Sequence, residues 1–238
     1  MMISIITPVL NGERYIRDCV NCVKNQTYKD VDHIIMVSED TTDKTLKILE
    51  ELEYDKLQVI VMDGYGHTRM HRAACLTNSK YVTFLMVDDL LNENFCQKML
   101  ISSITNNADI TYSNYKMVYY DKNYKEIDSH LGTPLPYRGL DKVIENMHFG
   151  VFYLIKRDAW NRIGGLSYPD NRNDIAWDYY LMLMAAHNNC EFYYNPEVLA
   201  TFRVHPESDT GKSNKIARET EVGDATRKYF LNKVKELE

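Results

Sequence analysis

The chain has 238 residues, of which 45% are hydrophobic and 26% are charged, and its formal net charge is −6 at pH 7. This length and composition predict a soluble globular protein made of one large α/β domain, or of one domain with a small appendage. The negative charge argues against a general nucleic-acid surface. No apolar run approaches the ~20 residues that cross a bilayer, and the first residues lack a signal-peptide pattern, so we expect a cytoplasmic protein.

The first half of the chain alternates short apolar strands with amphipathic helices. Strands that are apolar on both faces, separated by helices, predict a parallel Rossmann-like sheet covered by helices. The expected strands are Ser4–Val9, His33–Ser38, Gln58–Asp63 and Tyr81–Val87; the expected helices are Tyr15–Gln26 after an Asn11-Gly12 turn, a helix capped by Thr42 and reaching Glu53, and one that follows the glycine-containing loop at Gly64.

The second half is less regular and shows no linker, so we expect it to complete the same cleft. Its expected elements are a tyrosine-rich strand at Asp109–Tyr120, an exposed loop at 124–139, a strand with a short helix after Asp158 and a Gly-Gly turn within 147–167, a helix at Asp174–His187, two strands at 191–196 and 199–205, and a charged helix at Asn214–Glu238.

Five cysteines without framework spacing predict reduced thiols. Cys19 and Cys22 form a C-x-x-C, which could be a redox motif or half of a zinc site. Ile16, Cys19, Val20 and Val23 nevertheless share helical spacing, and the chain has no second C-x-x-C. We therefore expect Cys19 to pack on the apolar face of a helix.

Polar residues follow four of the predicted strands: Thr7, the segment 38–43, Asp63, and the adjacent pair Asp88 and Asp89. Because the carboxyl ends of parallel strands meet at one edge of a sheet, we expect these residues to line one cleft. Two neighbouring carboxylates repel each other. Either solvent or a divalent cation could compensate, since Mg²⁺ and Mn²⁺ sites often combine one or two protein carboxylates with substrate phosphates.

A phosphate-binding role cannot rest on a glycine-rich loop, because neither of the common patterns occurs. It would rest on His67, Arg69, His71 and Arg72, which bring basic groups to the start of a predicted helix. The alternative is a solvated helix start with no ligand.

In order and spacing, these motifs resemble those of the family-2 glycosyltransferases, over about Ser4 to Ser208. The segments that carry the likeness are SIITPVLNGERYI, VSEDTTDKT, FLMVDD, DAWNRIGGLS, WDYYLML and FRVHPESDT. The resemblance implies the GT-A fold, an α/β fold with a mostly parallel sheet flanked by helices and a mixed acceptor-side half. It also implies a single domain, with a nucleotide-binding half at 1–90, an acceptor and catalytic half at 91–210 and a C-terminal helix at 211–238.

The resemblance also carries roles to individual residues. It implies that Asp88 and His205 bind a divalent cation, Mn²⁺ or Mg²⁺, and that Asp178 is the catalytic base. The other implied contacts to the nucleotide sugar are Thr7 and Pro8 at the nucleobase, Glu39 at the base or ribose, Asp89 beside Asp88, and Arg69 or Arg72 at the diphosphate.

The residues alone leave simpler interpretations open for two of these positions. His205 could be a surface histidine after a strand, and Asp178 a helix-start carboxylate stabilised by the helix dipole. Asp178, however, lies beside Trp177 in an otherwise apolar helix, where an unpaired carboxylate is costly. A catalytic role would explain that cost.

The implied reaction is inverting transfer of a sugar from a nucleoside diphosphate to a hydroxyl of a glycan or of a lipid-linked acceptor at the inner membrane face. Uridine is the family's commonest carrier, with guanosine or deoxythymidine as alternatives. Met86 and Trp177 replace acidic residues of the family pattern, so a non-catalytic nucleotide-sugar binder is one alternative. A sugar nucleotidyltransferase is another, although TPVLNGER is a poor match to the basic, glycine-rich loop it would need.

Overall fold

The computed structural model describes residues 1–145, 150–168, 174–208, 210–211 and 215–237. The strands are β1 (Ile3–Val9), β2 (Val31–Ser38), β3 (Leu57–Met62), β4 (Tyr81–Phe84), β5 (Leu90–Leu91), β6 (Ile110–Tyr120), β7 (Glu126–Gly132), β8 (Tyr153–Lys156) and β9 (Phe192–Val204). The helices are α1 (Ile16–Lys24), α2 (Thr45–Glu50), α3 (Gly66–Leu76), α4 (Phe95–Thr105), α5 (Leu140–Glu145), α6 (Arg157–Ile163), α7 (Trp177–His187) and α8 (Lys215–Leu237).

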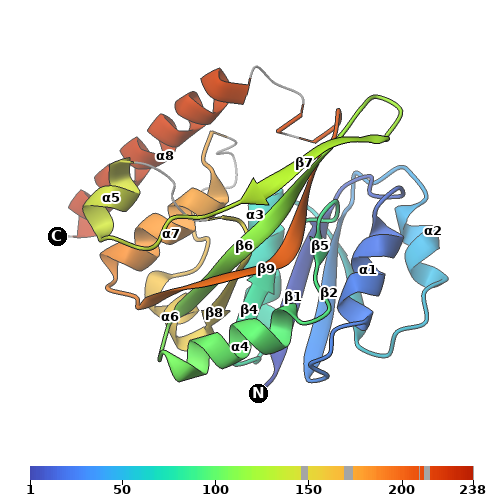
Figure 1. Cartoon of the computed structure of the whole chain (residues 1–238), viewed down its shortest axis with the longest axis horizontal. Helices are drawn as coiled ribbons and strands as arrows, with labels where there is room; N and C mark the ends of the chain where they lie inside the picture. The colour runs from blue at the N-terminus through green and yellow to red at the C-terminus, as the bar shows by residue number, and fades with distance from the viewer. Residues whose placement is uncertain (146–149, 169–173, 209, 212–214, 238) are drawn as a thin grey trace.

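All of these strands join one sheet, in the order β3-β2-β1-β4-β8-β6-β9-β5, with β7 added against β6 (Figure 1). The first four strands are parallel, and Ile6 on β1 lies between Ile34 and Phe84 of its two neighbours. The rest is mixed: β8 is antiparallel to β4 and β6, while β9 is parallel to β6 and antiparallel to β5. The predicted parallel first half and mixed second half are confirmed.

Helices cover both faces of the sheet, and the alternation of side chains along β1 explains how. Ile3 and Ile5 pack with Cys19 of α1 and with residues of α4. Ile6 points to the opposite face, where it belongs to the core shared with α3, α6 and α7. The chain is therefore a three-layer α/β/α structure, and its strand ends meet at one edge.

Two expectations for the second half were incomplete or wrong, and two helices were missed. The predicted loop at 124–139 contains strand β7, which is exposed along most of its length and is held by backbone pairing to β6. The two strands expected at 191–196 and 199–205 are one strand, β9, with a register shift opposite Asn114. Helices α4 and α5 were not predicted.

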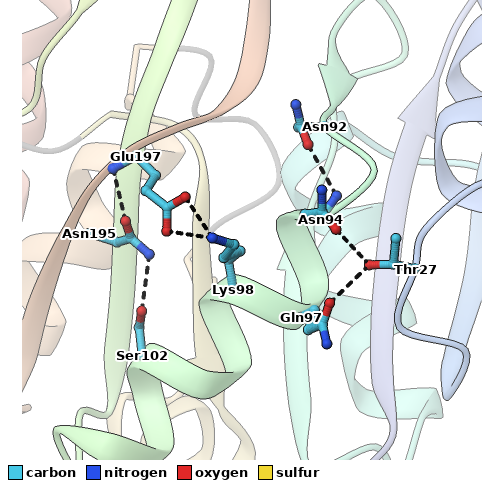
Figure 2. A network of polar contacts seen from close by, with 8 residues as sticks. All are labelled: Thr27, Asn92, Asn94, Gln97, Lys98, Ser102, Asn195 and Glu197. Carbon is cyan, nitrogen blue, oxygen red and sulfur yellow. Dashed lines mark hydrogen bonds and ion pairs between the residues drawn. The ribbon is translucent and has the colours of Figure 1, made fainter.

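Helix α4 is fixed by polar contacts at its first turns and along one side (Figure 2). The Thr27 hydroxyl donates to Asn94 Oδ1 at 3.1 Å and also reaches Gln97. Lys98 pairs with Glu197 at 2.8 Å. The network ties the helix to the segment after α1 and to β9, and it includes Thr27, Asn92, Asn94, Gln97, Lys98, Ser102, Asn195 and Glu197.

The loops after β1 and β2 hold each other in place. Asn11 adopts a left-handed φ of 53° at the predicted turn, and its side-chain oxygen accepts from Thr42 N at 2.8 Å. A Cβ on Gly12 would lie 2.5 Å from Val9, so the turn needs glycine there. The expected cap at Thr42 is wrong. Helix α2 begins at Thr45, whose backbone N–H donates to Asp43 Oδ1, and it ends at Glu50 rather than at Glu53.

The five cysteines are all free thiols, as expected, and Cys19 is buried. Burial raises the pKa of Cys22 to about 11. The buried position of Cys22 therefore favours its neutral thiol form, which agrees with packing on the apolar face of a helix. Within the described residues, no helix has the length and apolar character that a membrane crossing requires.

Candidate functional site

The acidic pair lies in a turn that leaves the sheet after β4. The strand ends at Phe84 rather than at Val87, and Asp89 N donates to Met86 O at 3.0 Å, which closes the turn. Asp88 is one-quarter exposed, and its Oδ2 lies 3.1 Å from Nε2 of the almost fully buried His205. The structure thus brings together two expected metal ligands that are 117 residues apart in the sequence.

Asp89 has a different environment from its neighbour. Its side chain is 1% exposed, and Oδ1 accepts a hydrogen bond from Arg203 N at 2.9 Å. Burial, followed by the adjacent charge of Asp88, raises the pKa of Asp89. The Arg203 guanidinium also donates to the Asp88 carbonyl and pairs with Asp18 at 3.2 Å. Asp89 and Arg203 therefore act as internal supports that leave Asp88 to face outward.

The turn after β9 orients His205. Ser208 accepts from His205 N at 3.1 Å and donates to His205 O at 2.8 Å. A Cβ on Gly211 would lie only 1.9 Å from that same carbonyl oxygen, so the chain can close here only with glycine. The hydrogen bonds with Ser208 and the close approach at Gly211 therefore hold the His205 imidazole beside Asp88.

Aromatic rings cover the outer side of His205. The Tyr15 ring lies 4.7 Å from the imidazole, and Tyr124, at the tip of the β6–β7 hairpin, lies 5.9 Å from it. Arg14 stacks on Tyr124 at 3.7 Å. Burial and the neighbouring Tyr124 raise the pKa of Tyr15. A hollow of about 160 Å³ opens beside this cluster, lined by Arg14, Tyr15, Asp18, Tyr120, Tyr124 and Arg203.

Asp178 lies in the first turn of α7, as expected for a helix-start carboxylate, and its Oδ1 accepts from Tyr179 N at 2.9 Å. Burial raises the pKa of Asp178 to about 6 despite the hydrogen bonds that lower it. Its negative charge also raises the pKa of Tyr153 and of Tyr168, after the larger effect of burial on each. Asp178 is thus a carboxyl group among tyrosine side chains, and its pKa lies near neutral pH.

The two candidate phosphate-binding arginines differ sharply. Arg69 is 5% exposed, donates to Gly64 O at 2.9 Å, and lies near Asp40. Arg72 is exposed and pairs with Asp63 at 3.0 Å on the surface. Arg69 is therefore fixed at the start of α3. Arg72 instead forms a solvent-exposed ion pair, which contributes little to the stability of the fold.

The residues expected around the nucleobase also differ in their exposure to solvent. Thr7 is fully buried, and its hydroxyl lies 3.0 Å from Nε2 of His33, so its side chain points under α1 rather than to the strand ends. Pro8 is half-buried and Glu39 is exposed. The Thr7 side chain is therefore enclosed by the structure, whereas Pro8 and Glu39 remain accessible.

Trp177 packs at the edge of the core against Phe84, with ring centroids 5.8 Å apart. Tyr179 and Tyr180 are buried, and the Tyr179 hydroxyl donates to Val143 O at 2.8 Å. Both tyrosines therefore pack in the core, where they are not accessible to a sugar.

The donor set at Asp88 fits a hard divalent cation. A carboxylate oxygen and an imidazole nitrogen lie 3.1 Å apart, while Asp89 and Ser208 hold the backbone on either side through Arg203 N and His205 N. The described residues contain no group of three or more His, Cys, Asp or Glu side chains able to hold a metal. A cation here would therefore take its remaining ligands from a diphosphate and water.

Sequence reasoning missed the aromatic cover of Tyr15 and Tyr124 and the support given by Asp18. Tyr15 carries no signal beyond helix-start placement, and Tyr124 was assigned to a loop. Arg203 was noted only as part of a motif, although the pattern of a charged residue inside a buried strand was a signal of its structural role.

The comparisons with known proteins agree with this geometry. Residues 4–163 match the family described as Glycosyl transferase family 2. A poly(ribitol-phosphate) beta-glucosyltransferase from Bacillus spizizenii is 31% identical over 123 residues, which are 49% of this chain and 19% of that protein. The chain spans 16, 41 and 34% of the length of three further curated relatives.

Two solved structures share the fold. S. aureus TarS 1-349 in complex with UDP-GlcNAc has a TM-score of 0.68 at 16% identity, covering 90% of this chain and 61% of that one. The mannosyltransferase PcManGT from Pyrobaculum calidifontis, in complex with GDP-Man and Mn2+, has a TM-score of 0.66 at 14% identity, covering 92% and 62%. The expected GT-A fold is confirmed.

Proposed function

Because the chain belongs to glycosyl transferase family 2, we propose that it transfers a sugar, with inversion, from a nucleoside diphosphate sugar to an acceptor hydroxyl. Two relatives with the same fold bind UDP-GlcNAc or GDP-Man, which supports a nucleotide sugar as donor. The acceptor that we propose is a glycan or a lipid-linked oligosaccharide, reached by a cytoplasmic protein at the inner membrane face.

Asp88 and His205 would hold the divalent cation, and Arg69 would bind the diphosphate from the start of α3. When bound, Mn²⁺ or Mg²⁺ would neutralise negative charge on the diphosphate. Arg69 supplies a buried guanidinium already fixed by Gly64 O, which lowers the entropic cost of binding. Asp89 and Arg203 hold the turn, and in this proposal the Asp88 carboxylate would face the phosphates.

Asp178 would be the general base that accepts the proton of the acceptor hydroxyl. A base works best when its pKa lies near the working pH, and burial raises the pKa of Asp178 to about 6. The base would be charged and ready at pH 7, and rate should fall as pH drops through about 6. The observation that carries the proposal is the approach of Asp88 to His205 at 3.1 Å in a chain of this family, and the buried position of Asp178 supports its role as the base.

The test combines binding and turnover on one preparation. Calorimetry measures UDP and GDP binding with MnCl₂ and with chelator, and product analysis follows transfer from UDP-GlcNAc and GDP-Man. We expect the cation to be required for tight binding, and Asp88→Asn to reproduce the effect of the chelator. Asp55→Asn, which removes an exposed carboxylate before the start of β3, is the matched control and should bind as the wild type does.

Equal affinity with and without the cation would remove the metal from the proposal. A wild-type protein that binds a sugar nucleotide but neither transfers nor hydrolyses its sugar, over a panel of acceptors, would favour the non-catalytic binder suggested by Met86 and Trp177.

A further inference from the structure

Strand β7 forms a free edge of the sheet. Within the part of the chain that the structure describes, it pairs with β6 and with no other strand, and it lies at the margin of the sheet in Figure 1. Its residues 126 to 131 are all exposed. An edge of this kind offers backbone N–H and C=O groups to another chain, and proteins usually protect it with charges, prolines or a covering element.

The side chains of β7 protect this edge poorly. Ile127 is 63% exposed and Leu131 is 55% exposed, and both lie on the same face of the strand as Ser129. The Ser129 N–H donates to the Asp128 carboxylate at 2.8 Å, so a neighbouring side chain rather than a strand satisfies it. Because alternate residues of a strand direct their backbone groups to opposite edges, Ile127 and Leu131 present theirs on the same edge as Ser129.

The sequence of β7 is complementary to itself when two copies run antiparallel. With Ser129 opposite Ser129 of the second copy, Asp128 faces His130, and this pair occurs twice across the two-fold axis. Ile127 then faces Leu131, also twice. A carboxylate opposite an imidazole and two aliphatic side chains opposite each other are both favourable cross-strand pairs. A register shifted by two residues would instead place Asp128 opposite itself or His130 opposite itself.

The two polar side chains of this pairing are available in the single chain. The Tyr119 ring stacks on the His130 imidazole with centroids 5.1 Å apart, and the Tyr119 hydroxyl lies 3.5 Å from its Nε2. Asp128 has no ion-pair partner among the described residues and bonds only the adjacent Ser129 N–H. An ordered imidazole would therefore meet a carboxylate that has no counter-ion of its own.

We propose that two copies of this chain associate through their β7 edges, which joins their sheets antiparallel about a two-fold axis at Ser129. The partner is a second copy because the complementarity requires the β7 sequence on both sides. A single strand pairing buries less area than a standard interface, so the dimer should be weak, with a Kd on the order of 10–100 μM. The pairing would also hold the β6–β7 hairpin, whose tip carries Tyr124 beside His205.

Sedimentation equilibrium of the whole chain, from about tenfold below to about tenfold above that Kd, measures the association. Asp128→Lys places a cation opposite the imidazole in both symmetric pairs and should raise the Kd at least ~10-fold. Adding His130→Glu to this variant restores opposite charges and should recover most of the affinity. Asp55→Lys makes the same charge change at an exposed position before β3, so it is the matched control and should leave the Kd within about twofold.

Cysteine crosslinking tests the register. In a Cys75→Ser background, which removes an exposed thiol, Ser129→Cys would place two cysteines opposite each other with Cα atoms about 5.5 Å apart. A disulfide accepts about 4.4–6.8 Å, so oxidised glutathione should convert this variant to a covalent dimer. Ile127→Cys is the control, because four residues of offset separate its two copies by more than ~13 Å along the strands, and it should stay uncrosslinked.

Each other outcome refutes the inference. A wild-type chain that remains monomeric at the highest concentration excludes the dimer. A dimer that Val61→Lys weakens and Asp128→Lys does not would lie on the β3 edge instead, and equal effects of Asp128→Lys and Asp55→Lys would reduce the contact to net charge. Crosslinking through Ile127→Cys but not through Ser129→Cys would contradict the register. Thermal melting checks the fold of each variant, and these exposed substitutions should shift Tm by less than about 2 °C.

Discussion

Asp178→Asn should make the protein more stable at neutral pH while strongly reducing turnover. The pKa of Asp178 is raised from 3.8 to about 6, so the folded state binds this proton more tightly than the unfolded chain does. Stability therefore falls as pH rises from about 4 to about 6, and the whole penalty is present above pH 6. At 1.36 kcal/mol for each unit of pKa, the penalty is about 3 kcal/mol as an upper value.

The asparagine removes this penalty because it cannot ionise. For a chain of this size, 1 kcal/mol shifts Tm by about 2–4 °C, so we expect a rise of several degrees at pH 7.5 and almost none at pH 4. Turnover should fall by a factor of ~100 to 10,000, the usual contribution of a general base, while donor affinity stays unchanged. Such a trade of stability for activity is common at active sites.

Differential scanning calorimetry at both pH values, with transfer assays at pH 7.5, measures the two effects. Asp158→Asn is the matched control, because Asp158 is an exposed carboxylate in the first turn of α6, and it should lower Tm slightly at both pH values through the helix dipole. An Asp178→Asn gain that is equal at pH 4 and pH 7.5 would refute the role of the buried charge. Normal turnover would refute its role as the base.

Three further predictions concern other parts of the chain. Burial lowers the pKa of His33 to about 3, so as pH falls the unfolded chain binds this proton before the folded protein does. The free energy of unfolding therefore decreases as pH drops below 6.5. His33→Gln should reduce this pH dependence by up to about 1.4 kcal/mol per pH unit, measured by urea unfolding. Arg69→Gln should weaken UDP or GDP binding roughly 10- to 100-fold in calorimetry, whereas Arg72→Gln should change it less than twofold. Gly211→Ala places a Cβ 1.9 Å from His205 O and should abolish the gain in nucleotide affinity with Mn²⁺, unlike Gly223→Ala, where a Cβ meets nothing within 4 Å.

The sequence was most informative where burial and periodicity coincide. Strands such as β1 and β2 are apolar on both faces, so their parallel pairing followed from pattern alone. Strand β7 could not be found in this way, because its side chains are exposed and it is held by backbone bonds to β6. Helix α4 carries no cap or charge pattern of its own, and its anchoring depends on distant residues such as Glu197.

At the candidate site, the sequence predicted which residues to examine but not how they face. The motif order suggested that Asp88 and His205 act together, and the structure brings them to 3.1 Å. The sequence could not show which of Arg69 and Arg72 is the better candidate for diphosphate binding. The two lie three residues apart on one helix, and only tertiary packing buries Arg69. The contacts of the Thr7 side chain could not be predicted either, because they depend on Cys19 and His33, which tertiary packing brings to the same face of the sheet.

The central position of β9 has a consequence for how the protein is made. Strand β5 pairs with β9 and with no other described strand, and β9 also supplies Arg203, which holds Asp89, and leads into His205. A ribosome that has synthesised the first 190 residues has therefore made β1 to β4 but neither Arg203 nor His205, which contact Asp89 and Asp88. The growing chain must keep Asp88 and Asp89 without these partners until β9 emerges and inserts between β6 and β5. The contacts around Asp88 would then form in one step, when β9 is in place, rather than accumulate as the first four strands fold.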